Sequence, residues 1–231
     1  MGWLFAREPE LVDADRALKG GRHPVLEHPR PHAVLGTSLV GPWDEGLREL
    51  YVGLGCFWGA EKLFWQMDGV HVTSVGYAGG ITENPTYREV CSGRTNHTEI
   101  VHIVYDPKQV RFEQLVAAAL EAHDPTQGYR QGNDVGTQYR SAIYTQDAQE
   151  AEQAAAMVEA YGKRLEQEGY PRITTEVKPL ADTPAGRYFL AEDEHQQYLH
   201  KNPYGYCPHH STGVACGPDI AQDGPEDSAD H

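Results

Sequence analysis

The 231-residue sequence has little positive charge and no long apolar segment, and each shortage excludes a class of protein. It holds 19 Lys and Arg residues against 34 Asp and Glu, a formal net charge of −15 at pH 7. Nucleic acids and anionic membranes attract basic faces, so we expect neither as a partner. A membrane-spanning helix needs roughly 20 consecutive apolar residues, and the sequence contains no such run.

Secretion signals and cysteines are also scarce. The apolar run within residues 1–8 is too short for a secretory signal and has no basic segment before it, so we expect a cytoplasmic protein. In that reducing compartment, cysteines do not serve as structural disulfides. They are then core residues, metal ligands or redox-active thiols. The chain has four: Cys56, Cys91, Cys207 and Cys216.

Composition divides the chain into three parts. Residues 1–46 are rich in Pro, Gly, His and Arg and show little periodicity, which predicts an N-terminal arm that covers a core formed elsewhere. Residues 47–203 carry regular apolar patterns and are predicted to form the catalytic α/β domain. Residues 204–231 turn to Gly, Pro, His and Asp, which is typical of a flexible C-terminal segment.

The apolar periodicity of the central part predicts a definite order of elements. Strands are expected at 49–54, 70–77, 99–105, 139–144 and 174–180. Helices are expected at 60–67, 112–122 and 147–168. Two polar, glycine-bearing loops, 78–96 and 123–138, have the length of functional segments. The order β-α-β-β-α-β favours an α+β fold, a two-layer α/β sandwich with a split βαβ and a ferredoxin-like core, followed by an irregular C-terminal segment.

The stretch Gly55-Cys56-Phe57-Trp58-Gly59 lies where the first strand turns into the first helix. At such a turn the N–H groups and dipole of the helix favour a thiolate and lower its pKa. No Ser, Thr, Asp or Asn stands at the cap position, so the sulfur or a ligand oxygen could occupy it. These features indicate a nucleophile, although a buried cysteine at a tight turn would give the same pattern.

Several longer blocks resemble one known family, the A-type peptide methionine sulfoxide reductases. The blocks are GCFWG at 55–59, GYAGG at 76–80, NPTYREVCSG at 84–93, GNDVGTQYRSAIY at 132–144 and AEDEHQQYLHKNPYGYC at 191–207. The resemblance covers roughly residues 47–207. It implies the two-layer sandwich and an enzyme that reduces the S epimer of methionine sulfoxide, free or in proteins.

Sulfoxide reduction needs a soft nucleophile on sulfur and a proton for the departing oxygen. Glu99 is the predicted acid, because strand alternation places it on one face with Val101 and Ile103, where burial would keep it neutral. It also matches the catalytic acid of the family. Tyr87 and Tyr139 are predicted to donate hydrogen bonds to the oxygen, and the resemblance adds Asp134, which would orient this network.

Phe57 and Trp58 are predicted to bind the substrate, because the small apolar methyl group of methionine sulfoxide suits an aromatic wall. After oxygen transfer, Cys56 would be a sulfenic acid that a second thiol can resolve. The resemblance makes Cys207 the resolving cysteine and Cys216 the second recycling cysteine. Thioredoxin would then reduce the final disulfide. Cys91 is interpreted as a packing residue.

Three alternatives compete with this reading. Cys207, His209, His210 and Cys216 have the density of a zinc site, although their spacing fits no common pattern. A thiol peroxidase or disulfide exchanger could use Cys56 and Cys207, and a non-enzymatic binding module would need neither. We expect a monomer without a metal or prosthetic cofactor, with oxidised proteins or free methionine sulfoxide as substrate and thioredoxin as its protein partner.

Overall fold

The computed structural model describes residues 8–206 and 211–217 of the chain. Its centre is a six-stranded sheet in the order β7-β6-β1-β3-β2-β8. Its strands are β1 (Arg48–Leu54), β2 (Val70–Ala78), β3 (Thr98–Tyr105), β6 (Ser141–Thr145), β7 (Glu176–Pro179) and β8 (Phe189–Leu190). The helices are α1 (Phe57–Trp65), α2 (Tyr87–Cys91), α3 (Phe112–Glu121), α4 (Ala148–Gln167) and α5 (Tyr198–Lys201).

The sheet topology confirms the predicted split βαβ. Strands β1 and β2 are joined through α1, and β3 lies between them, antiparallel to both. Strand β6 pairs antiparallel with the other edge of β1, which completes the ferredoxin-like core order. The short parallel strand β7 and the two-residue β8 extend the sheet at its two edges.

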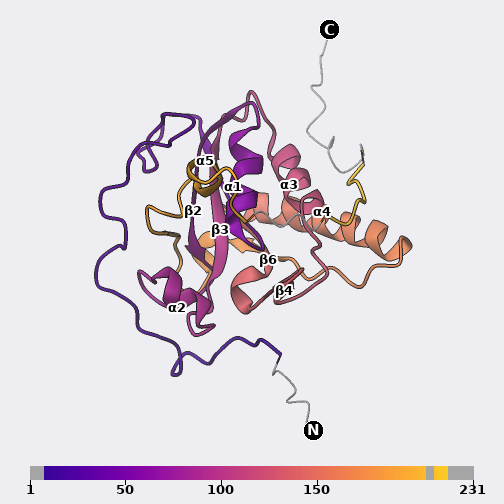
Figure 1. The fold of residues 1–231 in the computed structure, drawn as a ribbon. Helices are drawn as coiled ribbons and strands as arrows, with labels where there is room; N and C mark the ends of the chain where they lie inside the picture. Colours follow the sequence, from indigo (N-terminus) through magenta and orange to yellow (C-terminus); the bar gives the residue numbers. More distant parts are fainter. Residues whose placement is uncertain (1–7, 207–210, 218–231) are drawn as a thin grey trace.

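Helices α1, α3 and α4 cover one face of the sheet, and Figure 1 shows them together on the same side of β2 and β3. The main core lies between these layers and draws alternate residues from β1, β2 and β3, including Leu50, Val52 and Leu54 of β1. Because side chains alternate along a strand, Val101 and Ile103 of β3 face this same core. The predicted two-layer sandwich is therefore confirmed.

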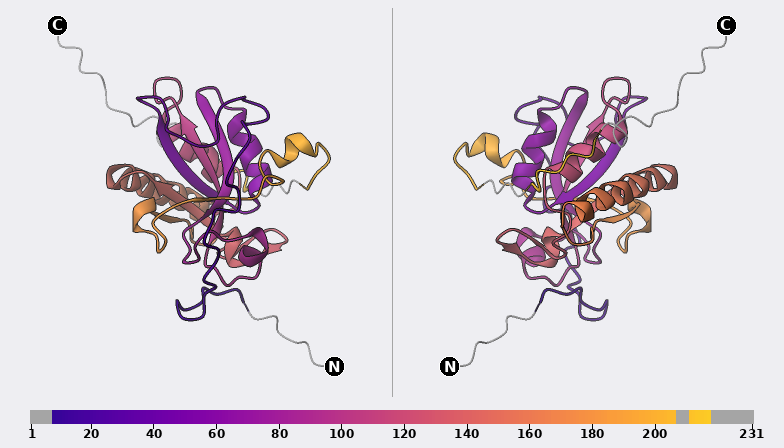
Figure 2. Two further views of the ribbon diagram at one scale, coloured as in Figure 1. Left: turned by 90° about the vertical axis from the view of Figure 1, so that its left-hand side faces the viewer. Right: turned by 90° about the vertical axis from the view of Figure 1, so that its right-hand side faces the viewer.

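On the opposite face of the sheet, the described residues form no long helix. This face is covered by the arm of residues 8–46 and by the segment that leads into β8, and the two side views of Figure 2 show the arm crossing one side and α4 lying on the other. Leu39 packs with Val72 and Val104 in one small cluster. Tyr51 and Tyr144 belong to a second cluster.

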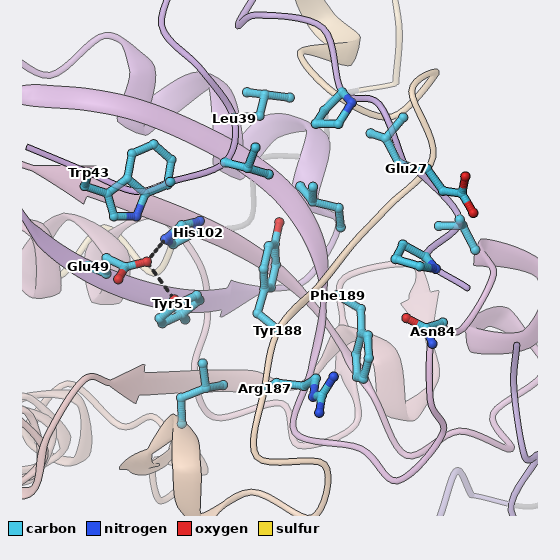
Figure 3. Close-up of a pocket in the computed structure, with 18 of the residues that line it drawn as sticks. Glu27, Leu39, Trp43, Glu49, Tyr51, Asn84, His102, Arg187, Tyr188 and Phe189 are labelled. Atoms are coloured by element: carbon cyan, nitrogen blue, oxygen red, sulfur yellow. Dashed lines mark hydrogen bonds and ion pairs between the residues drawn. The ribbon is translucent and has the colours of Figure 1, made fainter. Parts of the chain in front are cut away.

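A cavity of about 590 Å³ lies on the face that the arm covers. Figure 3 shows Trp43, His102 and Tyr188 around it, with the carboxylate of Glu49 bound by two neighbours. His102 Nε2 donates to Glu49 at 2.7 Å and the Tyr51 hydroxyl donates at 2.9 Å. The His102 hydrogen bond is the main cause that lowers the pKa of Glu49 to about 2. These hydrogen bonds satisfy polar groups of β1 and β3 under the arm.

Both predicted loops contain short elements that periodicity did not reveal. Helix α2 lies within the first loop, and its N-cap Thr86 forms a capping box with Glu89. The second loop holds the small ribbon of β4 (Arg130–Gln131) and β5 (Asp134–Val135), followed by the 3₁₀ turn η1 (Thr137–Tyr139). Such elements are too short to carry a periodic apolar signal.

Helix α1 begins at Phe57, earlier than the predicted start at residue 60, and Cys56 is its N-cap residue. The turn before it depends on Gly55, which has φ +91°, a conformation that side chains disfavour. A Cβ at this position would lie 2.7 Å from Cβ of Gln131. Gln131 cannot move away easily, because its side-chain amide bonds both the N–H and the carbonyl of Asp124.

We predict that Gly55→Ala destabilises the protein by about 2–4 kcal/mol, because backbone strain and overpacking add together. Gly46→Ala is the matched control, since Gly46 has φ +95° and nothing lies within 4 Å of its added Cβ. That variant should lose only about 1–2 kcal/mol. Urea unfolding measures both changes, and equal losses would show that Gln131 does not restrict this turn.

Candidate active site

Cys56 lies at the junction of β1 and α1 and is half-buried. The structure therefore places the sulfur at the helix start, as the sequence predicts. A cavity of about 230 Å³ adjoins it, lined among the described residues by Leu54, Cys56, Gly59, Ala60, Leu63, Ala122 and Ser211. The thiol can thus be approached from the side of α1 that faces the C-terminal segment.

The carboxyl of Glu99 lies directly beside the Cys56 turn. The first N–H of α1, that of Phe57, donates to Glu99 Oε2 at 3.0 Å. The sequence predicts that the sulfur or a ligand oxygen could occupy this helix cap. In the structure, the first N–H donor of the helix is instead bonded to the side chain of Glu99 on β3. The peptide group that follows Cys56 is therefore bonded to the carboxyl.

Glu99 is only 1% exposed, as the alternation of β3 predicts. Burial raises the pKa of its carboxyl to about 8, although the hydrogen bond from Phe57 opposes this shift and the charge of Asp134 adds to it. At neutral pH the group is therefore mostly protonated. Its second oxygen, Oε1, is buried and makes no hydrogen bond to any described residue.

Asp134 contributes another buried oxygen to this region. Its Oδ2 makes no hydrogen bond within the described part of the chain, and neither does the buried Oε1 of Gln138. The other oxygen of Asp134, Oδ1, accepts a 3.3 Å hydrogen bond from the hydroxyl of Tyr206. Three buried oxygens without hydrogen-bond partners among the described residues therefore belong to residues at or next to the predicted site, and such acceptors are open to a hydrogen-bonding ligand.

The phenols of Tyr87 and Tyr139 both lie within the field of the Glu99 carboxyl. For each, burial is the main cause that raises the pKa of the hydroxyl, and the charge of Glu99 raises it further. Tyr139 also interacts with Cys56 and Asp134. Both phenols therefore keep their protons at neutral pH and remain hydrogen-bond donors.

Cys91 is not the packing residue that the sequence indicated. It ends α2 at the surface, and its thiol shares a hydrogen bond with the side chain of Tyr87. Partial burial is the main cause that raises the pKa of this thiol. Tyr87 is in the first turn of α2, so the short helix brings the Cys91 thiol next to the Tyr87 phenol. The sequence predicts a loop over residues 78–96 and therefore does not predict this contact.

Phe57 and Trp58 begin α1 and lie among other aromatic rings. Phe57 is 1% exposed, and its ring centroid lies 6.4 Å from that of Tyr87. Trp58 is half-buried, and its indole N–H donates to Nδ1 of His195 at 3.3 Å. Tyr198 stacks on Trp58 with 3.9 Å between ring centroids.

His195, Tyr198 and Glu192 were not assigned from the sequence, although their block was noticed. Glu192 accepts hydrogen bonds from the hydroxyl of Tyr77 at 3.1 Å and from the backbone N–H of Tyr87 at 2.8 Å. The dense run of acidic, polar and aromatic residues at 191–199 was the available signal. This run has no apolar periodicity, so the sequence does not predict which of its side chains face the site.

Cys216 is buried away from the cavity beside Cys56. Its backbone N–H donates to Glu121 Oε1 at 2.6 Å and its sulfur lies 3.9 Å from the carbonyl oxygen of Ala117, both on α3. Burial raises the pKa of its thiol to about 12. Cys207 lies outside the described residues, as do His209 and His210 of the alternative zinc set.

Within residues 8–206 and 211–217, no three His, Cys, Asp or Glu side chains are grouped so that they could hold a metal ion. In the same ranges, no helix has the length and apolar character needed to cross a membrane.

Comparison with known proteins gives a consistent result. The family model of peptide methionine sulfoxide reductase matches residues 48–216. The peptide methionine sulfoxide reductase MsrA of Corynebacterium glutamicum (strain R) is 66% identical over 217 residues, which cover 94% of this chain and 99% of that protein. The MsrA of Streptomyces griseus is 52% identical over 214 residues, covering 93% and 95%.

Solved structures agree with the sequence comparisons. Methionine sulfoxide reductase A of Corynebacterium diphtheriae is similar with a TM-score of 0.83 and 67% identity, over 90% of this chain and 99% of that one. Mxr1 of Saccharomyces cerevisiae in reduced form has a TM-score of 0.67 and 29% identity, over 75% and 97%. The chain belongs to the peptide methionine sulfoxide reductase family, whose members are oxidoreductases that reduce methionine sulfoxide.

The raised pKa of Glu99 predicts how its replacement changes stability with pH. Because the folded pKa of about 8 exceeds the ordinary value of 4.5, the carboxyl favours folding below pH 4.5 and loses that contribution as pH rises through 8. Glu99→Gln cannot ionise. Relative to wild type, its free energy of unfolding should rise by a few kcal/mol between pH 4.5 and pH 9.

Glu49→Gln is the contrasting control, since the folded pKa of Glu49 is lowered to about 2. That carboxylate stabilises the fold above pH 4.5 and ceases to do so as pH falls through 2, so its replacement should destabilise the protein at neutral pH. Denaturant unfolding from pH 2 to pH 9 tests both signs, because the Glu49 contribution changes below pH 4.5 and the Glu99 contribution changes above it. A flat difference for Glu99→Gln would contradict a neutral, buried carboxyl.

Proposed function

We propose that this chain reduces the S epimer of methionine sulfoxide, free or in proteins, with Cys56 as nucleophile and Glu99 as acid. The observation that carries the proposal is the hydrogen bond from Phe57 N–H to Glu99 Oε2. It joins the residue after the sulfur to a buried carboxyl whose pKa is raised to about 8. A nucleophile and a neutral acid beside each other are what sulfoxide reduction needs.

In the reductive step, the thiolate of Cys56 gains the oxygen and the S–O bond of the sulfoxide breaks. Glu99 supplies the proton, so that the products are methionine and the sulfenic acid of Cys56. The methionine sulfur is reduced by two electrons, and the cysteine sulfur is oxidised by the same two. Oxide is a poor leaving group, and the neutral carboxyl removes the need to release it unprotonated.

The sulfoxide oxygen is held by hydrogen bonds from neutral groups. Tyr87 and Tyr139 donate through phenols whose raised pKa values keep them protonated. Asp134 orients the network, which is supported by its charge interaction with Glu99 and Tyr139. Donors of this kind favour the transition state because they are in place before charge develops on the oxygen.

Phe57 and Trp58 receive the methyl group of the substrate. Their rings form an apolar wall with His195 next to the Cys56 turn. If the enzyme recognises the S–CH₃ end, the rest of the substrate needs few specific contacts. This supports activity on both free methionine sulfoxide and exposed oxidised methionines of many proteins.

Recycling uses the C-terminal cysteines. Cys207 attacks the sulfenic acid of Cys56, which forms a disulfide and releases water. Tyr206, which precedes Cys207, already contacts Asp134, and this supports an approach of the segment to the site. Cys216 then exchanges with that disulfide, and thioredoxin reduces the Cys207–Cys216 bond.

Because Cys216 is buried against α3, the 211–217 segment has to leave its place for the exchange. No prosthetic cofactor takes part in these steps, and a monomer suffices, in the cytoplasm where thioredoxin is kept reduced.

Cys56→Ser should form no methionine from methionine sulfoxide in a single-turnover assay, because a serine hydroxyl cannot accept the oxygen. Cys91→Ser is the matched thiol control and should form as much methionine as wild type, since Cys91 only touches Tyr87 in this scheme. Mass spectrometry of the quenched protein measures the oxidised thiol. Methionine formed by the Cys56→Ser variant would overturn the proposal.

Glu99→Gln should bind the substrate but lower the single-turnover rate by about 10²–10⁴-fold, because an amide cannot deliver a proton. In wild type the rate should fall as pH rises through about 8, where the acid becomes ionised. The variant should lack this descending limb. A pH profile of single-turnover rates at saturating substrate measures both effects, and an unchanged limb in Glu99→Gln would assign the proton to another group.

A further inference from the structure

Glu61 is a fully buried carboxyl that the proposed reaction does not use. It lies on α1 with 0% exposure. It accepts hydrogen bonds from three donors: Thr73 Oγ1 at 3.2 Å, the backbone N–H of Gln197 at 2.8 Å and Gln197 Nε2 at 2.7 Å. Burial of a carboxyl costs free energy unless such hydrogen bonds offset it. The burial of Glu61 therefore needs a structural or functional explanation.

Two of the three donors come from one residue, Gln197, whose backbone is in the left-handed region with φ +47°. A non-glycine residue adopts that conformation only where its surroundings fix it. Glu61 supplies that constraint, because it bonds both the backbone and the side chain of Gln197. The preceding Gln196 bonds the N–H and carbonyl groups of Val75 on β2. The segment 191–198 is thus fixed to α1 and β2.

The fixed segment carries the rings that complete the aromatic wall. His195 accepts the hydrogen bond of the Trp58 indole, and its ring lies 4.3 Å from that of Tyr87. Tyr198, which follows Gln197, stacks on Trp58 at 3.9 Å. Release of Gln197 would therefore loosen the rings on both sides of Trp58.

We propose that Glu61 is a positioning residue for substrate binding, which holds His195 and Tyr198 against Trp58 through its two hydrogen bonds to Gln197. This inference rests on the proposed function, since it assigns the wall to the methyl end of methionine sulfoxide. Glu61 touches none of the reacting atoms in that scheme. It acts on how tightly the substrate is bound and not on the chemical step.

An ion pair between Glu61 and the arm is the competing role, and the geometry disfavours it. His32 Nε2 lies 4.0 Å from Glu61 Oε1 and instead bonds Thr73 Oγ1 at 3.0 Å. Burial is the main cause that lowers the pKa of His32 to about 4, so the ring is neutral at pH 7. Lys201 on α5 acts on Glu61 only through its charge. The direct contacts of the carboxyl are therefore Gln197 and Thr73.

Glu61→Gln is the main test, because the amide keeps the volume but has one oxygen to offer the two Gln197 donors. The variant should raise KM for free methionine sulfoxide about tenfold, equivalent to about 1.4 kcal/mol, with kcat within about threefold of wild type. In NMR spectra, the indole N–H resonance of Trp58 should move, because its bond to His195 loosens. Loss of kcat with unchanged KM would overturn the proposal.

Thr73→Val is the matched control, since it removes the third donor of Glu61 and leaves both Gln197 bonds in place. It should keep KM within about twofold of wild type, and a rise equal to that of Glu61→Gln would overturn the proposal. If Glu61→Gln does not fold, Gln197→Ala carries the test. It keeps the backbone bond and should raise KM about threefold, and an unchanged KM would contradict the positioning role.

Binding in a Cys56→Ser background separates the two proposals. There the affinity for methionine sulfoxide is measured by calorimetry without any chemistry, and Glu61→Gln should weaken it about tenfold. Turnover by Cys56→Ser would refute the proposed mechanism, and the role of Glu61 would then be judged from the KM values and the Trp58 resonance. Equal affinity with and without Glu61→Gln would refute only the role of Glu61.

Discussion

One hydrogen bond sets the relation between the two groups on which the proposed chemistry depends. The N–H that opens helix α1 donates to Glu99, and it belongs to the residue that follows Cys56. A helix N-terminus usually satisfies such a donor with a nearby side chain, and here the acceptor comes from a distant strand. The bond fixes the carboxyl next to the sulfur, while burial outweighs it and keeps the carboxyl neutral. The start of α1, the Cys56 turn and the Glu99 carboxyl are therefore one structural unit.

The sheet makes that unit possible. Strands β1 and β3 are neighbours in the split βαβ, so the end of β1 with its following turn adjoins the beginning of β3. Glu99 stands near that beginning and faces the helix layer together with Val101. The segment 191–198, which follows β8, then places His195 and Tyr198 against Trp58. The groups that we propose for catalysis and binding thus come from parts of the chain that only the topology brings together.

The sequence predicted the elements and the buried faces of this site better than the contacts between those elements. Strand alternation correctly placed Glu99 on a buried face, because a period of two is a local property. The position of Cys56 at a strand-to-helix turn was equally local. The acceptor of the Phe57 N–H depends on tertiary structure, so the cap was left open. His195 and Glu61 were missed for the same reason, since no spacing within α1 or residues 191–199 indicates that these elements touch.

The burial of Cys216 has a consequence for how the thiols withstand oxidants. Cys91 is exposed and Cys56 is half-buried, so peroxide in the surrounding solution can reach both. Cys216 is sealed under its own segment, with the pKa of its thiol raised to about 12. Since reaction with peroxide requires a thiolate, this cysteine is protected from overoxidation to sulfinic acid while the enzyme waits for substrate. The fold thereby keeps one thiol of the chain in an unreactive, protonated form.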